Sequence, residues 1–398
     1  MHHDDESSVT PPVLAARPSL MRALNEQMLL EQIQRLDRVS RSDLSAVSGL
    51  SKPTVAAALA TLEKGGLIQV AGRISGRRGR APTLYQLRPE AGFVLGLDVG
   101  REYVRGAIAD LSGAVRARGQ RKVHPASSAG RVSELVALAD ELVATVKIKR
   151  STVTQTVIGS PGIYDGRRNA LFMARGLPGW QRPQVLAELR RAFGEDMVVE
   201  NDINLAALAE RDVGTAQGVQ NFGFLSVGTG IGLGLIIDGK LHRGSHGGAG
   251  EIGFMTLGSD ASVDPNDAKR RGWLESAASA AGVVRAAKQA KMSGVVTARR
   301  IFAEAEHGDT LCARIVADEA RLMARAIASI TAVVDLDLVV LGGGIGQGEY
   351  FVELVTRELR PIVRLPIAVR ASALGEEAIV QGSLAVGAEH AWQRVMKR

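Results

Sequence analysis

Two neighbouring residues, Asn201 and Asp202, have the types and the placement that could do chemistry. They follow an apolar run at 197–199 and precede a helical pattern at 205–211. The carboxyl end of a strand that passes into a helix is the place where α/β sheets put their ligand chemistry. The sequence therefore predicts a ligand site at this strand end.

A glycine-dense stretch at 222–253 is the second candidate, and it reads as two apolar strands joined by the turn Gly228-Thr229-Gly230. Glycines at positions 228, 230, 232 and 234 would let backbone amides approach a ligand closely and would permit positive φ angles. Such a turn is typical of a nest for phosphate or sugar hydroxyls. A tight hairpin that needs glycine for its geometry alone explains the spacing equally well. The upstream Asn201-Asp202 pair favours the ligand site.

Length and composition limit the classes of protein to which the chain can belong. At 398 residues the chain is long enough for two or three domains. No apolar run reaches the roughly 18 residues that span a bilayer, and the N-terminus lacks the basic start and apolar core of a signal peptide. Cys312 is the single cysteine, which excludes an intrachain disulfide and a cysteine-rich zinc site. We expect a cytoplasmic protein with no membrane partner, in which residues 1–18 are a disordered lead-in.

The net charge of +7 is concentrated near the N-terminus. Residues 17–88 hold 12 Lys and Arg against 5 Asp and Glu, a balance typical of a nucleic-acid-binding segment on a larger, near-neutral body. Helical spacing predicts a first helix at 23–36, a second that ends at Ser48 with Leu44 and Val47 facing inward, and a third that Ser51 caps. The last two form a helix-turn-helix.

The third helix and the segment after it contain the expected DNA contacts. Ser51, Lys52 and Thr54 lie near the N-terminus of the helix that normally enters the major groove. Strands at 67–70 and 83–87 flank a basic loop and complete a winged helix-turn-helix at 19–88. Its arginines can reach phosphates or a narrow minor groove; they are Arg73, Arg77, Arg78 and Arg80. A purely structural three-helix domain and a solvated charge run are the alternatives. The arginines beside a helix-turn-helix favour double-stranded operator DNA as the partner.

From about residue 20 to the end, the chain resembles the repressor branch of the ROK family, which joins a winged helix-turn-helix to a sugar-kinase-like body. The resemblance rests on motifs that occur in one order, among them LSKPTVAAALATLEKGGLI, GRRGRAPTLYQL, VENDINLAALAE, SVGTGIGLGLIIDG, GAGEIG, WLESAAS and VVLGGGI. It implies an α/β protein in which residues 89–398 form a two-lobed body with the actin-like ATPase and sugar-kinase (ribonuclease H-like) fold.

The resemblance also assigns roles to single residues. In the enzymes of the family, the Asp of the N-D-x-N motif is the general base that activates a sugar hydroxyl for phosphoryl transfer, and Asp202 matches it. Asn201, Glu251 and Glu275 match positions that contact sugar hydroxyls, which both donate and accept hydrogen bonds. The alternatives are a turn residue for Asn201 and a helix-start residue for Glu275.

Other positions depart from the pattern of the enzymes. The kinase motif Asp-x-Gly-x-Thr keeps Asp98 and Gly100 but has Glu102 for its threonine, and this carboxylate would repel the phosphates of ATP. These two residues and the turn Gly228-Thr229-Gly230 are then a vestigial phosphate loop. Phe254 stands where the family has a zinc-binding and sugar-binding His. The resemblance thus implies no cofactor and no catalysis, with Asp202 as a vestigial base position.

Two more departures concern the metal and the sugar. The three cysteines of the family's zinc motif are absent from residues 266–273, so we expect no metal, because a tetrahedral zinc site cannot be built there. Gly176 replaces the sugar-contacting Asn of the family's P-N-L-x-G-W loop. Either the ligand differs from glucose-like sugars, or ligand binding has decayed.

Three functional hypotheses remain open. The first is a transcriptional regulator, a repressor of carbohydrate-related genes, whose body senses a sugar or a sugar derivative. We expect it to be a homo-oligomer, a dimer or a tetramer, because two half-sites multiply specificity. The second is a body that binds no sugar and serves as a dimerisation scaffold. The third is an active sugar kinase with a DNA-binding head. The departures from the kinase motifs oppose the third, while the missing sugar contacts keep the second open beside the first.

Overall fold

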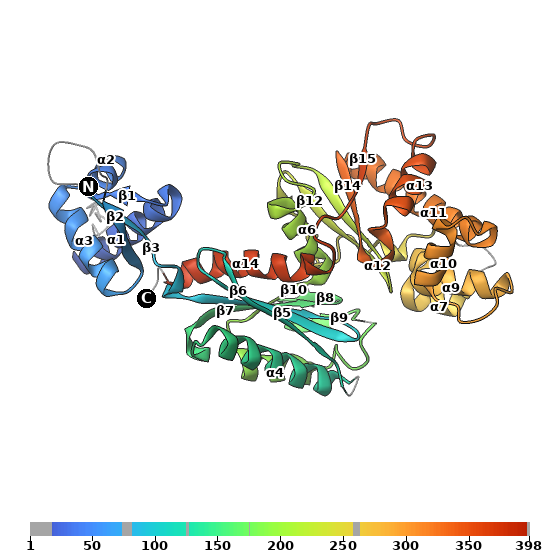
Figure 1. Ribbon diagram of the computed structural model, residues 1–398, viewed down its shortest axis with the longest axis horizontal. Helices are drawn as coiled ribbons and strands as arrows, with labels where there is room; N and C mark the ends of the chain where they lie inside the picture. Colours follow the sequence, from blue (N-terminus) through green and yellow to red (C-terminus); the bar gives the residue numbers. More distant parts are fainter. Residues whose placement is uncertain (1–17, 74–81, 125–126, 175, 258–262, 396–398) are drawn as a thin grey trace, which may run out of the picture. The chain divides into compact units, whose positions relative to one another are not determined.

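The computed structural model describes residues 18–73, 82–124, 127–174, 176–257 and 263–395. The chain divides into two compact units (Figure 1). One, here called the head, contains the chain up to Ala91 together with its end from Trp392. The other, here called the body, is Gly92–Ala391. Among the described helices, none has both the length and the apolar character needed to cross a bilayer.

The head is a three-helix domain with a small sheet. Its elements are α1 (Pro18–Leu36), β1 (Val39–Ser40), α2 (Arg41–Ser48), α3 (Lys52–Lys64), β2 (Ile68–Arg73) and β3 (Thr83–Leu87), and the strand order is β1-β3-β2. Helices and sheet share one core, which includes Leu30, Leu44, Leu59 and Tyr85. A helix-turn-helix followed by a strand hairpin is the winged fold that the sequence predicts.

Capping residues set the ends of α2. The hydroxyl of Ser40 accepts a hydrogen bond from the N–H of Asp43, and the Asp43 carboxylate accepts one from the N–H of Ser40. Gly49 ends the helix at a φ of 70°, a conformation that favours glycine. The inward orientation expected for Val47 is wrong, because Leu44 alone fills the α2 side of the core and Val47 is 55% exposed.

The two large sheets of the body have the same topology. The first sheet has the order β10-β7-β4-β5-β6, and the second has the order β13-β12-β11-β14-β15. In each sheet the first three strands of the chain are antiparallel neighbours, and two later strands extend it in parallel. The strands of the first sheet are β4 (Phe93–Val99), β5 (Tyr103–Asp110), β6 (Val115–Lys122), β7 (Val153–Ser160) and β10 (Val198–Asn201). Those of the second are β11 (Phe222–Val227), β12 (Ile231–Ile237), β13 (Lys240–Leu241), β14 (Leu338–Gly342) and β15 (Ala368–Ala371). The two lobes expected from the sequence are these two sheets with their helices.

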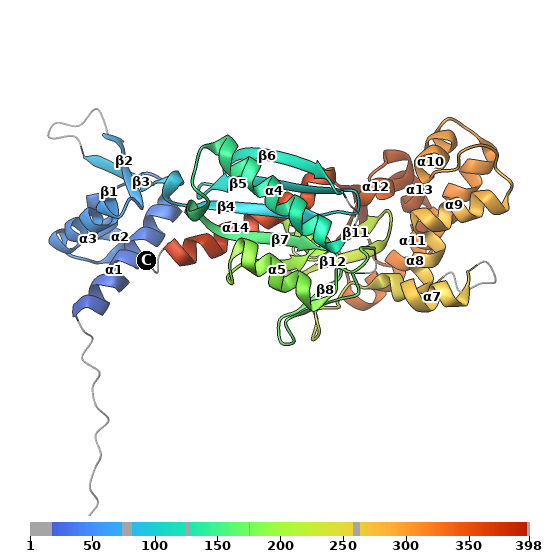
Figure 2. The same cartoon turned by 90° about the horizontal axis from the view of Figure 1, so that it is seen from below.

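Helices cover both faces of the first sheet (Figure 1 and Figure 2). On one face, α4 (Ser128–Val146) packs Leu138 against Gly106 and Gly119, and α5 (Pro183–Phe193) lies beside it. On the other face, α14 (Ala378–Val395) packs Leu384 against Gly96. The short strands β8 (Ile163–Asp165) and β9 (Ala170–Phe172) form a separate hairpin.

The second sheet is likewise covered on both faces. Residues of α6 (Asp202–Val213) pack with Phe224 and Ile236 on one face, and α11 and α13 belong to the large core on the other. The remaining helices of the body are α7 (Pro265–Arg271), α8 (Trp273–Ala278), α9 (Ala280–Gln289), α10 (Ala298–Glu306), α11 (Thr310–Val334), α12 (Gly343–Gly346) and α13 (Glu349–Leu359). Single 3-10 turns occur at Pro89–Ala91, Arg150–Thr152, Ile252–Phe254 and Gly375–Glu377.

Helix α6 contacts three other elements at glycine positions. A β-carbon at Gly159 of β7 would lie 3.0 Å from Leu205, and one at Gly234 of β12 would lie 2.7 Å from the β-carbon of Ala207. A β-carbon at Gly382 of α14 would overlap the carbonyl oxygen of Leu205. These close approaches hold α6, and with it Asp202, at a defined place between the two sheets.

The close contact at Gly382 predicts that replacing this glycine by alanine lowers the stability of the protein, whereas the same change elsewhere in a helix usually raises it. Gly→Ala in a helix interior usually stabilises, but Gly382→Ala forces α14 away from α6 and should cost about 1 to 3 kcal/mol by overpacking. Urea unfolding of the full chain measures it. Gly344→Ala in α12 is the control, since no atom lies within 4 Å of its added carbon. Equal stability of the two variants would contradict this packing.

Candidate functional site

The start of α3 presents the expected DNA contacts. Ser51 caps the helix, and its hydroxyl accepts from the N–H of Thr54 at 3.3 Å and lies 2.8 Å from the Thr54 hydroxyl. Lys52 follows as the first helical residue, and both Ser51 and Lys52 are exposed. The two hydroxyls therefore define the helix start, while Lys52 extends from it as a cation.

The wing is the hairpin of β2 and β3. Arg73 ends β2, and its partner across the hairpin is Thr83. Arg77, Arg78 and Arg80 lie outside the residues that the structure describes. A contact that the sequence did not indicate involves Arg41, whose guanidinium donates to the Tyr85 hydroxyl at 2.6 Å and lies over its ring. This contact ties α2 to the wing strand.

In the body, two carboxylates from different strand ends come together. Asp98 lies near the end of β4, and Asp202 begins α6 directly after β10. Asp98 is only 3% exposed, whereas Asp202 is partly buried. The sequence named both residues for separate reasons, one from a phosphate motif and one from a base motif, and the structure brings them close enough to interact electrostatically.

Both carboxyls bind protons more tightly than usual. Burial, and then the charge of Asp202, raise the pKa of Asp98 to about 7, against a lowering by Arg105. Burial raises the pKa of Asp202 to about 6, against a lowering by the N–H of Ile203. Near neutral pH Asp98 is therefore partly protonated, while Asp202 is mostly ionised. Such a pair can donate one hydrogen bond and accept others, which suits hydroxyl groups of a ligand.

The amide of Asn201 serves the local structure. Its oxygen accepts from the N–H of Ile203 at 2.9 Å and from that of Asn204 at 3.1 Å, and its nitrogen donates to the carbonyl of Gly162 at 2.9 Å. Asn201 is thus the N-cap of α6. This geometry corresponds to the turn role that the sequence left open, and it orients the adjacent Asp202.

Glu275 braces the glycine turn. It lies on α8, and its Oε2 accepts from the N–H of Ile231, the first residue of β12, at 3.2 Å. On the other side of the turn, the N–H of Ala280 donates to the carbonyl of Gly228 at 2.8 Å. Within the turn, the N–H of Gly228 donates to the carbonyl of Gly230 at 3.0 Å. The turn carrying Thr229 is therefore held in one conformation from both sides.

One of the two reasons expected for the glycines of this stretch, a positive φ angle, was wrong. None of Gly228, Gly230, Gly232 and Gly234 has a positive φ. Close neighbours restrict three of the four positions: β-carbons at Gly232 and Gly234 would meet Ile203 and Ala207 of α6, and one at Gly230 would lie 3.0 Å from Glu275. The restriction is tightest at Gly234, where α6 packs on β12 and a β-carbon would lie 2.7 Å from that of Ala207.

Three loops contain the positions that depart from the enzyme pattern, together with Glu251 and Gly100, which keep it. Glu251 precedes the 3-10 turn Ile252–Phe254, and Phe254 at its end is 37% exposed. Gly176 has open space where a β-carbon would be. Gly100, by contrast, lies tightly against the carbonyl of Tyr103 in the β4–β5 hairpin. Glu102 of the same hairpin is exposed.

The segment that corresponds to the family's zinc motif folds as a helix. Asp264 caps α7 by accepting from the N–H of Asn266 at 2.9 Å, and Asp267 pairs with Arg270 at 2.9 Å and Arg271 at 3.3 Å. Over the described parts of the chain, no three His, Cys, Asp or Glu side chains are grouped so that they could hold a metal ion. The ion pairs of α7 thus lie at positions between those of the family's cysteines, which Asn266, Ala268 and Trp273 occupy here.

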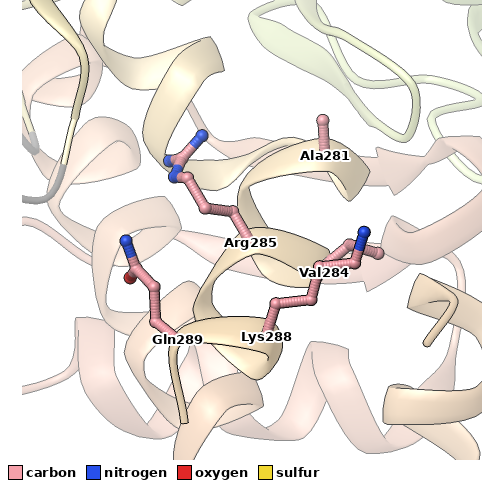
Figure 3. A pocket seen from close by; sticks show the side chains of 5 residues that line it. All are labelled: Ala281, Val284, Arg285, Lys288 and Gln289. Carbon is pink, nitrogen blue, oxygen red and sulfur yellow. The ribbon is translucent and has the colours of Figure 1, made fainter. Parts of the chain in front are cut away.

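A surface hollow lies along α9 (Figure 3). It is lined by five residues of this helix: Ala281, Val284, Arg285, Lys288 and Gln289. Arg285 donates to the carbonyl of Ser276 at 2.5 Å. None of the residues that the sequence singled out lines this hollow, and its walls contain no carboxylate. The Asp98–Asp202 pair is therefore the stronger candidate for ligand chemistry.

Family models match both parts of the chain. The ROK family model matches residues 94–394, and a model described as winged helix-turn-helix DNA-binding matches residues 24–69. The chain belongs to the ROK family. This ROK protein also carries a DNA-binding winged helix-turn-helix, so the predicted fold class and the predicted family are both confirmed.

Its relatives include regulators and enzymes. A xylose repressor from Caldicellulosiruptor bescii is 26% identical over 391 residues, covering 92% of this chain and 96% of the relative. A glucokinase from Halalkalibacterium halodurans is 26% identical and covers 64% of this chain and 81% of the enzyme. The regulator thus aligns with head and body together, and the enzyme aligns with a smaller share of the chain.

Solved structures confirm the fold. A ROK family transcriptional regulator, a homologue of the E. coli MLC protein, superposes with a TM-score of 0.75 at 23% identity, over 95% of this chain and 100% of that one. A ROK family glucokinase from Streptomyces griseus, solved with glucose and AMPPNP, superposes with a TM-score of 0.65 at 24% identity over 75% of this chain and 100% of that one. At these identities the likeness establishes the architecture alone.

Sequence reasoning missed one set of residues around Asp98. Arg105 of β5 lies 3.7 Å from the Asp98 carboxylate and donates to Glu376 at 2.7 Å, and Arg118 pairs with Glu377. Glu376 and Glu377 belong to the 3-10 turn that precedes α14. The arginines and their partners are more than 250 residues apart in the chain, and nothing in the local sequence signals the pairing.

The raised pKa of Asp98 makes stability depend on pH. Its folded pKa lies above its unfolded value, so the folded state holds more protons, and stability falls as pH rises from about 4 to about 7. Asp98→Asn removes this dependence and should stabilise the protein at pH 8, by about 4 kcal/mol at most. At pH 4 the gain should vanish. Thermal unfolding from pH 4 to 8 measures it, with exposed Asp140→Asn as the control. A gain that does not change with pH would contradict the assignment.

Proposed function

We propose that this ROK protein is a transcriptional repressor of carbohydrate-related genes, that its body senses a sugar or a sugar derivative, and that it has no enzymatic activity. The observation that carries the proposal is the combination of a winged helix-turn-helix and a ROK body in one chain. Relatives named xylose repressors support it, because the one from C. bescii aligns over both parts.

The Asp98–Asp202 pair supports an effector site in the body. A protonated Asp98 near an ionised Asp202 provides both a donor and acceptors for sugar hydroxyls. We assign Asp202 the main effector contact and Asn201 the role of positioning it, because the Asn201 amide already caps α6. Glu251 stays a candidate sugar contact, and Glu275 acts on the glycine turn that it braces.

A conformational switch would couple the effector to DNA. Such a switch requires that the effector binds one of two conformations more tightly. Arg105 contacts both Asp98 and Glu376, so a change at the carboxylate pair reaches the turn that begins α14. Helix α14 starts in the body, and its last residues belong to the head unit. We therefore propose α14 as the element that carries the change, in a homo-oligomer that engages two half-sites.

A sugar kinase is the second candidate, because the family contains glucokinases and Asp202 keeps the position of their base. Glu102 opposes it, since an exposed carboxylate in the first phosphate motif would repel ATP. ATP-dependent phosphorylation of a sugar by the full chain, abolished by Asp202→Asn, would establish the kinase in place of the repressor.

Fluorescence anisotropy on DNA from upstream of the gene tests the repressor and its effector together. The protein should bind this DNA tightly, and one member of a panel of sugars and sugar phosphates should weaken binding. Asp202→Asn should abolish the response to the effector while leaving DNA affinity unchanged, because Asp202 lies in the body. The exposed Asp318→Asn is the matched control and should respond as the wild type does. Indifference to every compound would favour the scaffold hypothesis.

The wing arginines predict a change in salt dependence. Removing two phosphate contacts with Arg78→Ala and Arg80→Ala should lower the slope of log affinity against log salt by about two and weaken binding to all sequences alike. The control is Arg360→Ala with Arg364→Ala, which removes the same charge from exposed positions of the body. If both double variants bind operator DNA as the wild type does at physiological salt, the wing does not contact DNA.

A further inference from the structure

Arg131 is a buried guanidinium with two unused hydrogen-bond donors. It lies one turn into α4 and is 1% exposed. Its Nη2 donates to the carbonyl of Arg101 at 3.0 Å, but its Nε and Nη1 are buried and have no hydrogen-bond partner. Burying a charge without pairing it is costly, and buried charged groups are normally paired or bind an ion. The arrangement therefore lacks an acceptor.

The surroundings of Arg131 add positive charge. Burial lowers the pKa of its guanidinium, and the nearby charge of Arg101 lowers it further. The N-terminus of α4, a helix of 19 residues that Ser127 caps, lies one turn away. Helix N-termini carry a partial positive charge and bind anions. Two guanidinium groups and a helix N-terminus thus converge, and they suit an anion that carries more than one charge.

This place adjoins the loop in which the family has its sugar-contacting Asn. A β-carbon at Gly179 would lie 3.2 Å from the Ser128 hydroxyl, in the first turn of α4, and 3.4 Å from Nε of Arg182. Three residues before it, Gly176 has open space at its β-carbon position. The open position at Gly176 therefore lies three residues from a glycine that contacts both the first turn of α4 and Arg182.

Hydrogen bonds connect the same loop to the strand end at Asp202. Trp180 donates to the Ser160 hydroxyl at 2.9 Å, and Ser160 ends β7. Two residues later, the carbonyl of Gly162 accepts from the Asn201 amide at 2.9 Å. The loop thus contacts the first turn of α4 on one side and the strand end before Asp202 on the other. A ligand bound at Asp202 would have its neighbouring substituents near this loop.

We propose that Arg131, Arg101 and the N-terminus of α4 form an anion subsite that binds the phosphate group of a sugar phosphate. The inference rests on the proposed function, because it takes the effector to be a sugar derivative. A phosphate offers several acceptor oxygens, which can pair with Nε and Nη1 of Arg131 and with Arg101 together. In this chain the subsite replaces the neutral contact that the family makes with Asn at position 176.

Calorimetric titration and thermal shift of the full chain test the subsite, with inorganic phosphate, hexose and pentose phosphates, and the same sugars unphosphorylated. The wild type should bind one sugar phosphate more tightly than its neutral sugar. Arg131→Met and Arg101→Ala should each weaken that binding by about tenfold or more, because each removes charge-assisted hydrogen bonds. Lys149→Ala is the matched control, since it removes an exposed charge beyond the opposite end of α4.

Stability of the unliganded protein provides a second readout. Arg131→Met replaces an unpaired buried charge by an apolar side chain of similar length, so without ligand it should unfold at a temperature no lower than the wild type. Arg101 is exposed, and Arg101→Ala therefore keeps the test valid if Arg131→Met fails to fold.

The possible results separate the two proposals. Equal binding of phosphate compounds to wild type, Arg101→Ala and Arg131→Met, or no binding to any, would overturn the subsite. If a neutral sugar releases the protein from DNA, and Arg131→Met does not change this release, the subsite proposal is also overturned. The proposal of a sugar-sensing repressor then still stands. Arg131-dependent binding of phosphate compounds, none of which affects DNA binding, would support the subsite and count against sugar control. If inorganic phosphate binds as tightly as every sugar phosphate, the subsite takes the free ion and the proposal for a sugar phosphate fails.

Discussion

Helix α6 is held by contacts that leave no room for a side chain, and the body depends on them. Gly159 of the first sheet, Gly234 of the second and Gly382 of α14 all meet α6 at distances that a β-carbon would violate. Interiors are close-packed, so such contacts fix relative positions well. Because Asn201 caps this helix and Asp202 begins it, the same packing sets where the carboxylate lies. Its approach to Asp98 follows from the position of a helix and does not depend on a mobile loop.

The first sheet of the body separates two charged centres of opposite sign. Along β4, Leu97 and Val99 belong to the core shared with α4, so the alternation of a strand places Asp98 on the face that α14 covers. Arg131 comes from α4, on the other face. Asp98 can lose its charge by binding a proton, because its pKa is raised to about 7, whereas the guanidinium of Arg131 cannot give up its charge readily. A neutral hydroxyl suits the first centre, and an anion suits the second. Arg131 donates to the carbonyl of Arg101, in the turn that follows β4, so a ligand must pass around the end of this strand to meet both centres.

The relatives of this chain include a xylose repressor and a glucokinase, and one fold can carry different functions. The glycine contacts hold the Asp202 helix against strands of both repeated sheets. Glu102 and Phe254 change the chemistry of the loops without disturbing that framework, since both lie at exposed positions. The head adds an independent core around Leu30, Leu44 and Leu59. Regulation then needs only that ligand binding in the body affects the DNA affinity of the head.

The sequence by itself determined the winged head and the two α/β lobes, because caps, turn residues and apolar spacing act over a few residues, and its ordered motifs indicated the family. Ser51 and Pro53 mark the start of α3 in the sequence as clearly as in the fold. The sequence alone did not explain why residues 232 and 234 are glycines, since the neighbours of Gly232 and Gly234 come from α6 and not from the turn itself. It gave no sign of the contact of Arg105 with Glu376 or of the missing partner of Arg131. Those facts depend on burial and on charges far apart along the chain, which only the tertiary structure brings together.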